Sequence, residues 1–537
     1  MALTNSITWR VRGGGNNANG GGFDPTTSGA LATTITGAIS AGATAMNVAS
    51  ATGWPSATSF YCVLSTAAKE PVGGGSEVVL VATTGGGAAW TITRAQLGTT
   101  ALAFPAGAIV SNELSRCNTA PWSGATGTST ASNVFTDGSA SFNLTVVGNV
   151  LYLASGTGAT VGAYLITGYN SPTSVNLDRA SGTYTNGAWK IGGAWADPAA
   201  RATIPLAGNT TYARAGGSGS VASPDYTVGY PGYSNGDGTN GPMRIIGENG
   251  RPWIKCTNPG FIYAGSAFYV EDLVFVSNTT GVPILYGTGV IKNVTLDQNG
   301  KDQTILNWSG NVTDSEFLSS SANGGAAGTN YAIVQGAYGL IMNRCNVHDC
   351  WGGGLQTTAG FFTAVVNSLF ANNKGTAIYL QNGSGQTPAA VQNCTIVGNG
   401  ADGIYIANAD TLSSSLIQDN IIKDHTGAGK YGIKTGSGTT ASNDRMRGLT
   451  CRNWFHNNTA DALNLTVGAL YGDSTGVDPG FSSAANENYA ITGAAKGWAA
   501  RAFVNTKSGT TPPTSYQNPG AVMGNPAGGA SMIIVGM

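Results

Sequence analysis

The chain has 537 residues, of which only 9% are charged, and its formal net charge is −1. This balance argues against a nucleic-acid partner, which would require a basic surface. Glycine is abundant at 81 residues, and the 41% of hydrophobic residues suffice to build cores beneath an uncharged polar surface. Neither a run of 18 apolar residues nor a cationic leader is present, so we expect no membrane insertion and no secretory signal.

Residues 1–32 are expected to form a flexible N-terminal arm. Residues 13–22 are mostly Gly and Asn, and such a run cannot bury enough apolar surface to fold alone. Trp9 and Val11 fit a short extended segment. The alternative is an arm that becomes ordered against a partner.

Residues 33–112 have the pattern of a small β module. Residues 77–81 and 90–93 are predicted to pair as strands across a Gly-rich turn at residues 85–87. The stretch resembles a small all-β module that recurs in virion proteins of tailed phages. The resemblance rests on Val48, Trp54-Pro55, Glu77, Arg94, Gly98-Thr99 and residues 107–110. Ala95 departs from that pattern, because Gly is usual there.

Residues 113–195 form a second predicted β module, in which strand patterns alternate with Gly, Ser and Asn turns. This region resembles segments that precede β-helices in phage and environmental bacterial proteins. The resemblance implies that both modules belong to an attachment region ahead of a long β domain.

Residues 270–451 contain a repeat with steps of 21 to 29 residues. Each unit has an apolar residue, a spacer, an Asn or Asp, two residues and another apolar residue. The Asn/Asp column consists of Asp272, Asn293, Asp314, Asn343, Asn367, Asn393 and Asp419, and it closes at Gly448. Apolar positions stand two residues before the column, as at Ile341, and three after it, as at Ile396, although Val347 is one place late.

The repeat predicts a parallel β-helix over residues 196–495. A period of 20 to 30 residues indicates a repeat architecture, and short β-branched or aromatic runs indicate strands. Strict alternation cannot place both apolar positions inside, so one residue per unit must adopt a left-handed turn conformation, which Asn, Asp and Gly tolerate. A second signal, Gly followed by an apolar strand, recurs after the column. Residues 391–406 resemble the repeat of right-handed parallel β-helix proteins.

The end of the chain has two parts. Residues 477–492 resemble the closing motif of many β-helix proteins, with matches at Asp478, Phe481 and Tyr489. Residues 496–537 form a C-terminal tail with an apolar end that a partner chain would bury.

Carboxylates in the turn column are the candidate catalytic groups. Asp272 and Asp314 are two coils apart, so their expected separation of about 9.6 Å suits an inverting glycosidase. The alternative, which we favour, is that Asp merely replaces Asn in the turn. Glu316 is a further candidate without a fixed partner. The sequence therefore favours a protein that is not an enzyme, with a polysaccharide hydrolase or lyase as the alternative.

Other site chemistry is sparse in the sequence. The three histidines form no Ser/His/Asp arrangement, and His425 is expected at the surface of a long loop. The seven scattered cysteines lack the spacing of metal ligands, so we expect no metal and no cofactor. Cysteines of this kind suit folding in a reducing cytosol.

Aromatic residues are spread through the repeat, and stacking on sugar rings is one use for them. The glycan-binding candidates are Trp308, Trp351, Tyr379 and Tyr405. The alternative is packing in the core or between three copies of the chain.

Together the resemblances imply a structural and adhesive phage virion protein. It would be a tail fibre, a tailspike-like appendage or a capsid decoration that presents a β-helix shaft. The expected partners are two further copies of the chain in a homotrimer, other virion proteins and a bacterial surface polysaccharide. The expected location is the virion, after assembly in the host cytoplasm. The alternatives are a polysaccharide-degrading tailspike and a bacterial surface adhesin.

Overall fold

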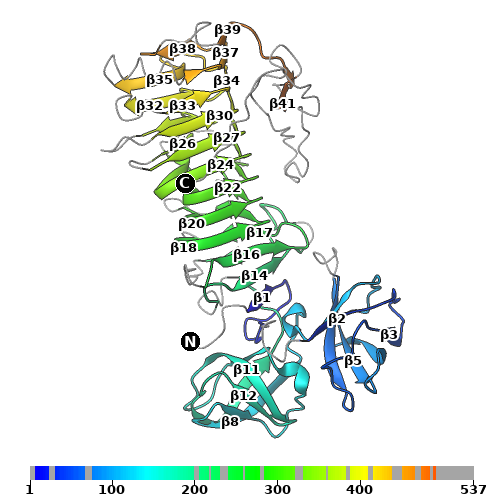
Figure 1. Cartoon of the computed structure of the whole chain (residues 1–537). Coiled ribbons are helices and arrows are strands. Elements are labelled where there is room, and N and C mark those ends of the chain that lie inside the picture. Colours follow the sequence, from blue (N-terminus) through cyan, green and yellow to red (C-terminus); the bar gives the residue numbers. More distant parts are fainter. Residues whose placement is uncertain are drawn as a thin grey trace. The chain divides into compact units, whose positions relative to one another are not determined.

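The described residues of the computed structural model are 7–22, 31–66, 75–198, 205–216, 219–229, 240–257, 261–277, 283–320, 330–357, 361–381, 388–408, 415–437, 450–465, 473–483 and 488–491. Residues 1–299 and residues 300–537 form two compact units. Across the described ranges the secondary structure consists of β-strands and two 3-10 turns, without an α-helix (Figure 1). The chain is therefore all-β, as the sequence predicts.

The first small module, in the first unit, is a six-stranded antiparallel sheet. Its strands, in sheet order, are β2 (Ala32–Thr34), β7 (Ile109–Ser111), β4 (Phe60–Ser65), β5 (Ser76–Thr83), β6 (Ala89–Gln96) and β3 (Ala45–Asn47). The predicted pairing across residues 85–87 is confirmed as β5 with β6. The core contains Trp54, Phe60 and Trp90, whose ring centroids are 5.2 to 5.5 Å apart.

Glu77 is the polar centre of this module. Its fully buried carboxylate accepts hydrogen bonds from Nε and Nη2 of Arg94, at 2.8 and 2.6 Å, and from the backbone N–H groups of Ala95 and Leu102. These contacts offset the cost of burying a charge. Ala95 has a φ of 54°, a conformation that glycine adopts more easily. The matched residues are therefore packing residues.

The second small module is a closed antiparallel barrel in the order β10-β11-β12-β9-β8-β13. Its strands are β8 (Trp122–Thr130), β9 (Val134–Thr136), β10 (Val150–Leu153), β11 (Gly162–Ser171), β12 (Ser174–Leu177) and β13 (Thr183–Ile191). The 3-10 turn η1 (Leu114–Arg116) precedes the barrel, and η2 (Leu144–Val146) lies within it. Trp189 packs against Phe135 and Phe142 in the core.

The first β-helix coils also belong to the first unit, and all their strand pairs are parallel. One sheet has the order β1 (Thr8–Val11), β14 (Thr210–Arg214), β16 (Met243–Glu248), β18 (Ile262–Glu271) and β20 (Leu285–Lys292). The other has the order β15 (Tyr226–Val228), β17 (Trp253–Cys256), β19 (Val274–Ser277) and β21 (Thr295–Asp297). Because β1 pairs with β14, both small modules are insertions between the first two strands of this sheet.

The N-terminal segment is ordered over residues 7–22, which differs from the flexible arm expected. Trp9 is fully buried, stacks on Trp195 at 4.7 Å between ring centroids, and donates a hydrogen bond to Asn209. A Cβ at Gly20 would lie 2.0 Å from a backbone oxygen of Val150, so the glycine is needed for close backbone contact. The Gly-rich composition therefore serves close packing against the chain's own barrel and coils.

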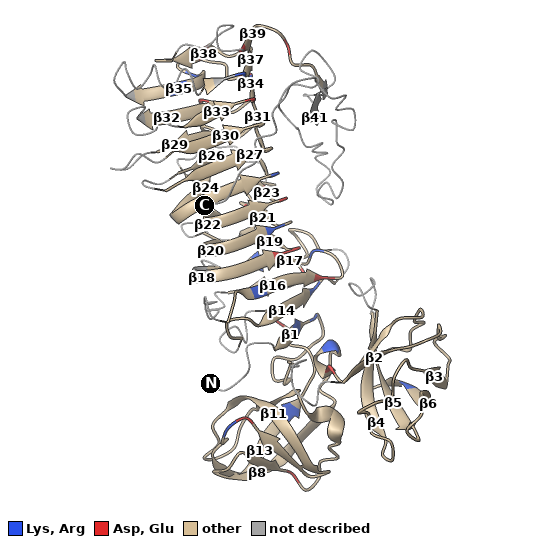
Figure 2. Ribbon diagram, viewed as in Figure 1, with Lys and Arg blue, Asp and Glu red and all other residues tan. Residues whose placement is uncertain are grey.

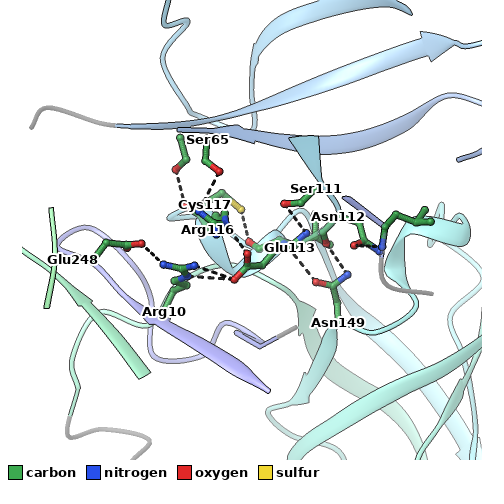
Figure 3. A network of polar contacts seen from close by, with 12 residues as sticks. Arg10, Ser65, Ser111, Asn112, Glu113, Arg116, Cys117, Asn149 and Glu248 are labelled. Carbon is green, nitrogen blue, oxygen red and sulfur yellow. Dashed lines mark hydrogen bonds and ion pairs between the residues drawn. The ribbon is translucent and has the colours of Figure 1, made fainter. Parts of the chain in front are cut away.

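A buried polar network joins this segment to the linker between the modules and to the first coils (Figure 3). Arg10 contacts Glu248 of β16 and, at 3.2 Å, Glu113 just before η1. Arg116 donates to the other oxygen of Glu113 at 2.5 Å and to Ser65 of β4 at 3.0 Å. Burial alone would raise the pKa of Glu113, but the charges of Arg10 and Arg116 outweigh burial and lower it. The network therefore holds an ionised carboxylate where β1, β4, β16 and the linker converge.

The second unit continues the coil pattern with parallel strands only, until its last hairpin. One sheet contains β22 (Leu306–Thr313), β24 (Tyr331–Asn343), β26 (Gly353–Gln356), β29 (Ile378–Leu380), β32 (Ile404–Asn408), β35 (Tyr431–Ser437) and β38 (Ala460–Leu463), and a branch from β24 through β27 (Thr363–Val366), β30 (Ala389–Gln392), β33 (Leu416–Gln418) and β36 (Thr450–Cys451). The other contains β23 (Glu316–Leu318), β25 (Asn346–His348), β28 (Leu369–Ala371), β31 (Thr395–Val397), β34 (Ile421–Lys423), β37 (Trp454–His456) and β39 (Ser474–Thr475). The predicted coil of strand, turn, strand, loop and Gly-led strand is therefore confirmed.

Left-handed residues occupy the predicted column in six coils. Positive φ values of 51° to 59° occur at Asp272, Asn293, Asp314, Asn367, Asn393 and Asp419. The apolar residues three positions later are fully buried, as Phe370 and Ile396 illustrate. A second left-handed column, missed in the sequence, follows five residues after the first at Asp349, Asn372, Gly398, Asp424 and Asn457.

The predicted turn residue is misplaced along the sequence in two coils, those assigned to Asn343 and Gly448. The left-handed residue is Arg344, with a φ of 58°, and Asn343 is the last residue of β24. Consequently Met342 points inward and is fully buried, whereas Ile341 is exposed. The final left-handed residue is Arg452, because Gln418 pairs with Cys451, and Gly448 lies outside the described residues.

The closing motif forms an antiparallel hairpin of β40 (Phe481–Ser483) and β41 (Asn488–Ile491). Asp478 accepts a hydrogen bond from Lys423 at 2.8 Å, and Phe481 packs on an apolar cluster that includes Leu369. The hairpin segment therefore packs on the sheet that contains β28, β31 and β34. The C-terminal tail of residues 496–537 lies outside the described residues.

We expect Ile396→Asp to prevent soluble folding, because it places a carboxylate without a partner at a fully buried position, at a cost of several kcal/mol. Gln392→Asp, four residues earlier in the same coil and only half-buried, should fold like the parent chain. Soluble yield and circular dichroism of the two variants measure the difference. Equal behaviour of the two variants would refute the register.

Candidate functional site

Each candidate catalytic carboxylate has a partner in a neighbouring coil. Asp272 accepts a 2.5 Å hydrogen bond from Nδ2 of Asn293, one coil later in the turn column. Asp314 accepts two hydrogen bonds from Arg344, each 2.7 Å long, in a bidentate pair. Asp419 is held in the same way by Arg452. Aspartates in this column therefore stabilise the stack of turns. Asp272 and Asp314 also belong to different compact units.

Glu316 also has a partner, which the sequence did not reveal. Its Oε1 lies 3.1 Å from Nε2 of His348, whose Nδ1 lies 2.9 Å from Asp349. Burial disfavours the imidazolium, but the two hydrogen bonds to carboxylates outweigh burial and raise the pKa of His348 to about 9. Glu316 therefore faces a cation at neutral pH. Glu316 is therefore bound to a side chain of β25, the strand that pairs with its own strand β23.

The expectation that His425 is a surface residue is wrong, because its side chain is fully buried. His425 belongs to an interior ladder of Asn373, Asn399 and Asn458 that follows the second left-handed column. Nδ2 of Asn399 lies 3.3 Å from Nε2 of His425, and Nδ1 of His425 lies 3.1 Å from Oδ1 of Asn458. The neutral ring satisfies both contacts by accepting at Nε2 and donating at Nδ1. Burial accordingly lowers the pKa of His425 to about 4.

Tyr379 and Tyr405 are two rings of a stack on adjacent strands. The centroids of Tyr379 and Tyr405 are 5.0 Å apart with planes 7° apart, and Tyr331 stacks on Tyr379 at 5.7 Å. Lys434 lies 5.1 Å from the Tyr405 ring. A Cβ at Gly353 would lie 2.1 Å from the Tyr331 ring, so this glycine makes room for the stack. Both faces of Tyr379 contact other rings, which leaves its edge and hydroxyl for any other contact.

The two tryptophan candidates differ from each other. Trp308 is completely buried, so it cannot present a ring to a glycan and is a core residue. Trp351 is half-buried, and the ammonium group of Lys374 lies 5.2 Å from its ring centroid. Among the four glycan-binding candidates, the structure thus removes Trp308 and restricts the ring faces of Tyr379.

The sequence did not identify an exposed group of three aromatic residues and one isoleucine among the described residues of the second unit. Tyr338, Ile341, Phe361 and Phe362 are 63%, 42%, 40% and 44% exposed, and we call these four residues the apolar patch. They lie on β24 and immediately before β27, which are paired strands. The sequence prediction placed Asn343 in the turn and therefore assigned Ile341 to the interior, so the patch was not predicted. A bulge signal, the glycines at positions 336 and 339 around Tyr338, was available in the sequence.

A buried glutamine holds the apolar patch in position. Nε2 of Gln335 lies 3.2 to 3.3 Å from the backbone oxygens of Tyr338, Phe361 and Phe362, which share its two N–H donors. Its Oε1 accepts a hydrogen bond from Thr363 at 2.9 Å. Because Gln335 is 1% exposed, these bonds fix three exposed aromatic residues to the rigid sheet.

Charges are sparse on the described strands of both units (Figure 2). No group of three His, Cys, Asp or Glu side chains that could hold a metal occurs within the described ranges. The part of the chain with assigned structure also contains no apolar helix long enough to cross a membrane. Its six cysteines with placed side chains are buried free thiols.

Comparison with known families supports the coil assignment. Residues 261–414 match the family model described as a right-handed β-helix region. Comparison with curated proteins found no match. The chain therefore contains a right-handed parallel β-helix.

We expect His425 to make the β-helix acid-sensitive. Its pKa falls from the ordinary value of 6.5 to about 4 in the folded chain, so its contribution to stability is present above pH 6.5 and is lost as the pH falls toward 4. The full shift corresponds to roughly 3 kcal/mol. The pKa of His348 is raised to about 9, so its contribution to stability is complete below pH 6.5 and is lost as the pH rises toward 9. His348 therefore does not affect stability between pH 6.5 and pH 5.

Urea unfolding at pH 6.5 and pH 5 measures this effect. His425→Asn restores the residue found in the neighbouring coils and should be less sensitive to this pH change than the parent chain. An identical loss of stability in both chains between these pH values would contradict the assignment.

Proposed function

We propose that the chain is a structural and adhesive protein of a phage virion, in which the two small β modules attach a β-helix shaft. One observation carries this proposal. The modules are inserted between β1 and β14 of the helix sheet, and the buried network of Arg10, Glu113 and Glu248 fixes this junction. Small modules that are rigidly joined to the first β-helix coils are suited to holding a shaft on a particle while the shaft contacts a surface.

The first module supports the same proposal through its resemblance to a phage virion module. The matched pair Glu77 and Arg94 forms the buried polar centre of that module. The residues that match the phage module pattern serve to pack the module, which is compatible with a role in attachment. It offers no reactive group at those positions.

The β-helix supports a shaft because its interior is bonded from coil to coil. In addition to backbone pairing, Asn373, Asn399 and Asn458 bind backbone oxygens of preceding strands. Asn420 and Asn453 form a second interior ladder at 3.0 Å. Saturated interior amides stiffen a solenoid against bending and local unfolding.

The depolymerase alternative is disfavoured by the surroundings of the candidate carboxylates. A glycosidase needs one carboxylic acid and one carboxylate held in different environments. Asp272, Asp314 and Glu316 each contact a hydrogen-bond donor or cation from a neighbouring coil. We therefore place the adhesive function ahead of catalysis, and we place a bacterial adhesin third.

The proposed partners are two further copies of the chain, other virion proteins and a surface polysaccharide. Exposed apolar side chains on a charge-poor surface favour contacts of this kind. Purified particles of the phage that encodes the chain should contain it in fixed stoichiometry, in copies that are a multiple of three. Quantitative mass spectrometry of the particles measures this number. Its absence from particles, combined with display on a bacterial surface, would establish the adhesin alternative.

The double variant Asp272→Asn and Asp314→Asn should fold and keep the adhesive role. Asn occupies the same turn at other coils, and the half-exposed pair of Asp314 with Arg344 is worth less than about 1 kcal/mol. Reducing-sugar release from host polysaccharide is the measurement. If the parent chain releases sugar and the folded double variant does not, the protein is a depolymerase.

A further inference from the structure

We infer that the apolar patch of Tyr338, Ile341, Phe361 and Phe362 is a binding site for an uncharged saccharide chain. This inference rests on the adhesive function proposed above and assigns it to particular residues of the second unit. It replaces the tyrosine stack as the principal surface for sugar rings.

The available ring faces distinguish the two aromatic groups. Tyr379 has neighbouring rings on both faces, at 5.0 and 5.7 Å. Tyr338 and Phe361 meet edge to face at 5.9 Å with planes 60° apart, and Tyr338 is 63% exposed. An edge-to-face pair leaves ring surface open. Open ring faces are what the C–H groups of a pyranose contact, and apolar contact of this kind is a main source of affinity at ligand sites.

The second argument is preorganisation. The buried amide of Gln335 bonds to the backbone of all three aromatic residues, and Oγ of Ser309 accepts a hydrogen bond from the backbone N–H of Tyr338 at 2.9 Å. A backbone that is fixed before binding loses little conformational entropy when a ligand arrives, which raises affinity.

Charge and size select the ligand. The patch contains no charged residue, and Arg344, three residues after Ile341 in the chain, is paired with Asp314. An anionic polysaccharide would require free cations at the site. A stable contact with a second protein requires about 800 Å² and 20 to 30 residues on each side, whereas the patch has four apolar side chains. These properties fit an uncharged sugar chain better than a second copy of this protein.

Affinity electrophoresis of the full chain through gels that contain dextran, mannan or galactan tests the inference, with alginate as the anionic comparison. At least one neutral polysaccharide should retard the parent chain. Tyr338→Ala with Phe361→Ala should weaken that binding about tenfold or more. Tyr338→Phe, which keeps the ring, should bind like the parent chain. Tyr286→Ala removes an exposed tyrosine of the first unit and should also leave binding unchanged.

Three outcomes would overturn the inference. They are the absence of retardation by any neutral polysaccharide, retardation by alginate alone, and full binding by the double variant. Light scattering of the double variant supplies a fourth outcome that would overturn the inference, because a fall in mass relative to the parent would identify the patch as a contact between copies. None of these results depends on particle content, so the virion proposal is judged separately.

Discussion

One residue per coil must adopt a left-handed conformation at the end of the first strand, and the β-helix depends on this constraint. Alternation along a strand would otherwise direct the next apolar residue outward. Residues with positive φ also leave their side chains on the outside, one coil apart, so like charges would be stacked at about 4.8 Å. The chain avoids this repulsion by pairing Asp with Asn or Arg, as in Asp272 with Asn293 and Asp314 with Arg344. The residue types in the turn column are therefore restricted both by the left-handed conformation and by the need to avoid like charges in neighbouring coils.

The same constraint explains which features were predictable from sequence. Period, strand composition and the Asn/Asp column follow from local conformational preferences, so the coil could be derived. Arg344 could not be found in this way, because Arg is uncommon at positive φ and is stabilised there by Asp314, 30 residues earlier. The burial of His425 likewise depends on amides from two other coils. Long-range partners decide these positions, and a local pattern does not contain them.

Glycine composition gave the opposite error at the N-terminus. Residues 13–22 have the composition of a flexible segment, yet Gly20 is required where two backbones meet. The segment is ordered by Trp9, Trp195 and the Arg10 network, which join parts of the chain that are far apart in sequence. A Gly-rich run that follows a buried tryptophan and a buried arginine can therefore indicate tight backbone packing. Composition alone does not distinguish it from disorder.

Aromatic residues in the second unit differ in function because their surroundings differ. In the stack of three tyrosines, Tyr379 and Tyr405 lie on adjacent strands, whereas Tyr331 lies two strands before Tyr379, across β26. The ring contacts therefore stabilise the stack of coils. At the bulge of β24 the extra residues break this alignment, and Tyr338 is turned outward with its face open. Bulges commonly redirect a side chain in this way. The tyrosine stack therefore contributes to the stability of the coils, whereas the bulge of β24 exposes an aromatic ring to solvent.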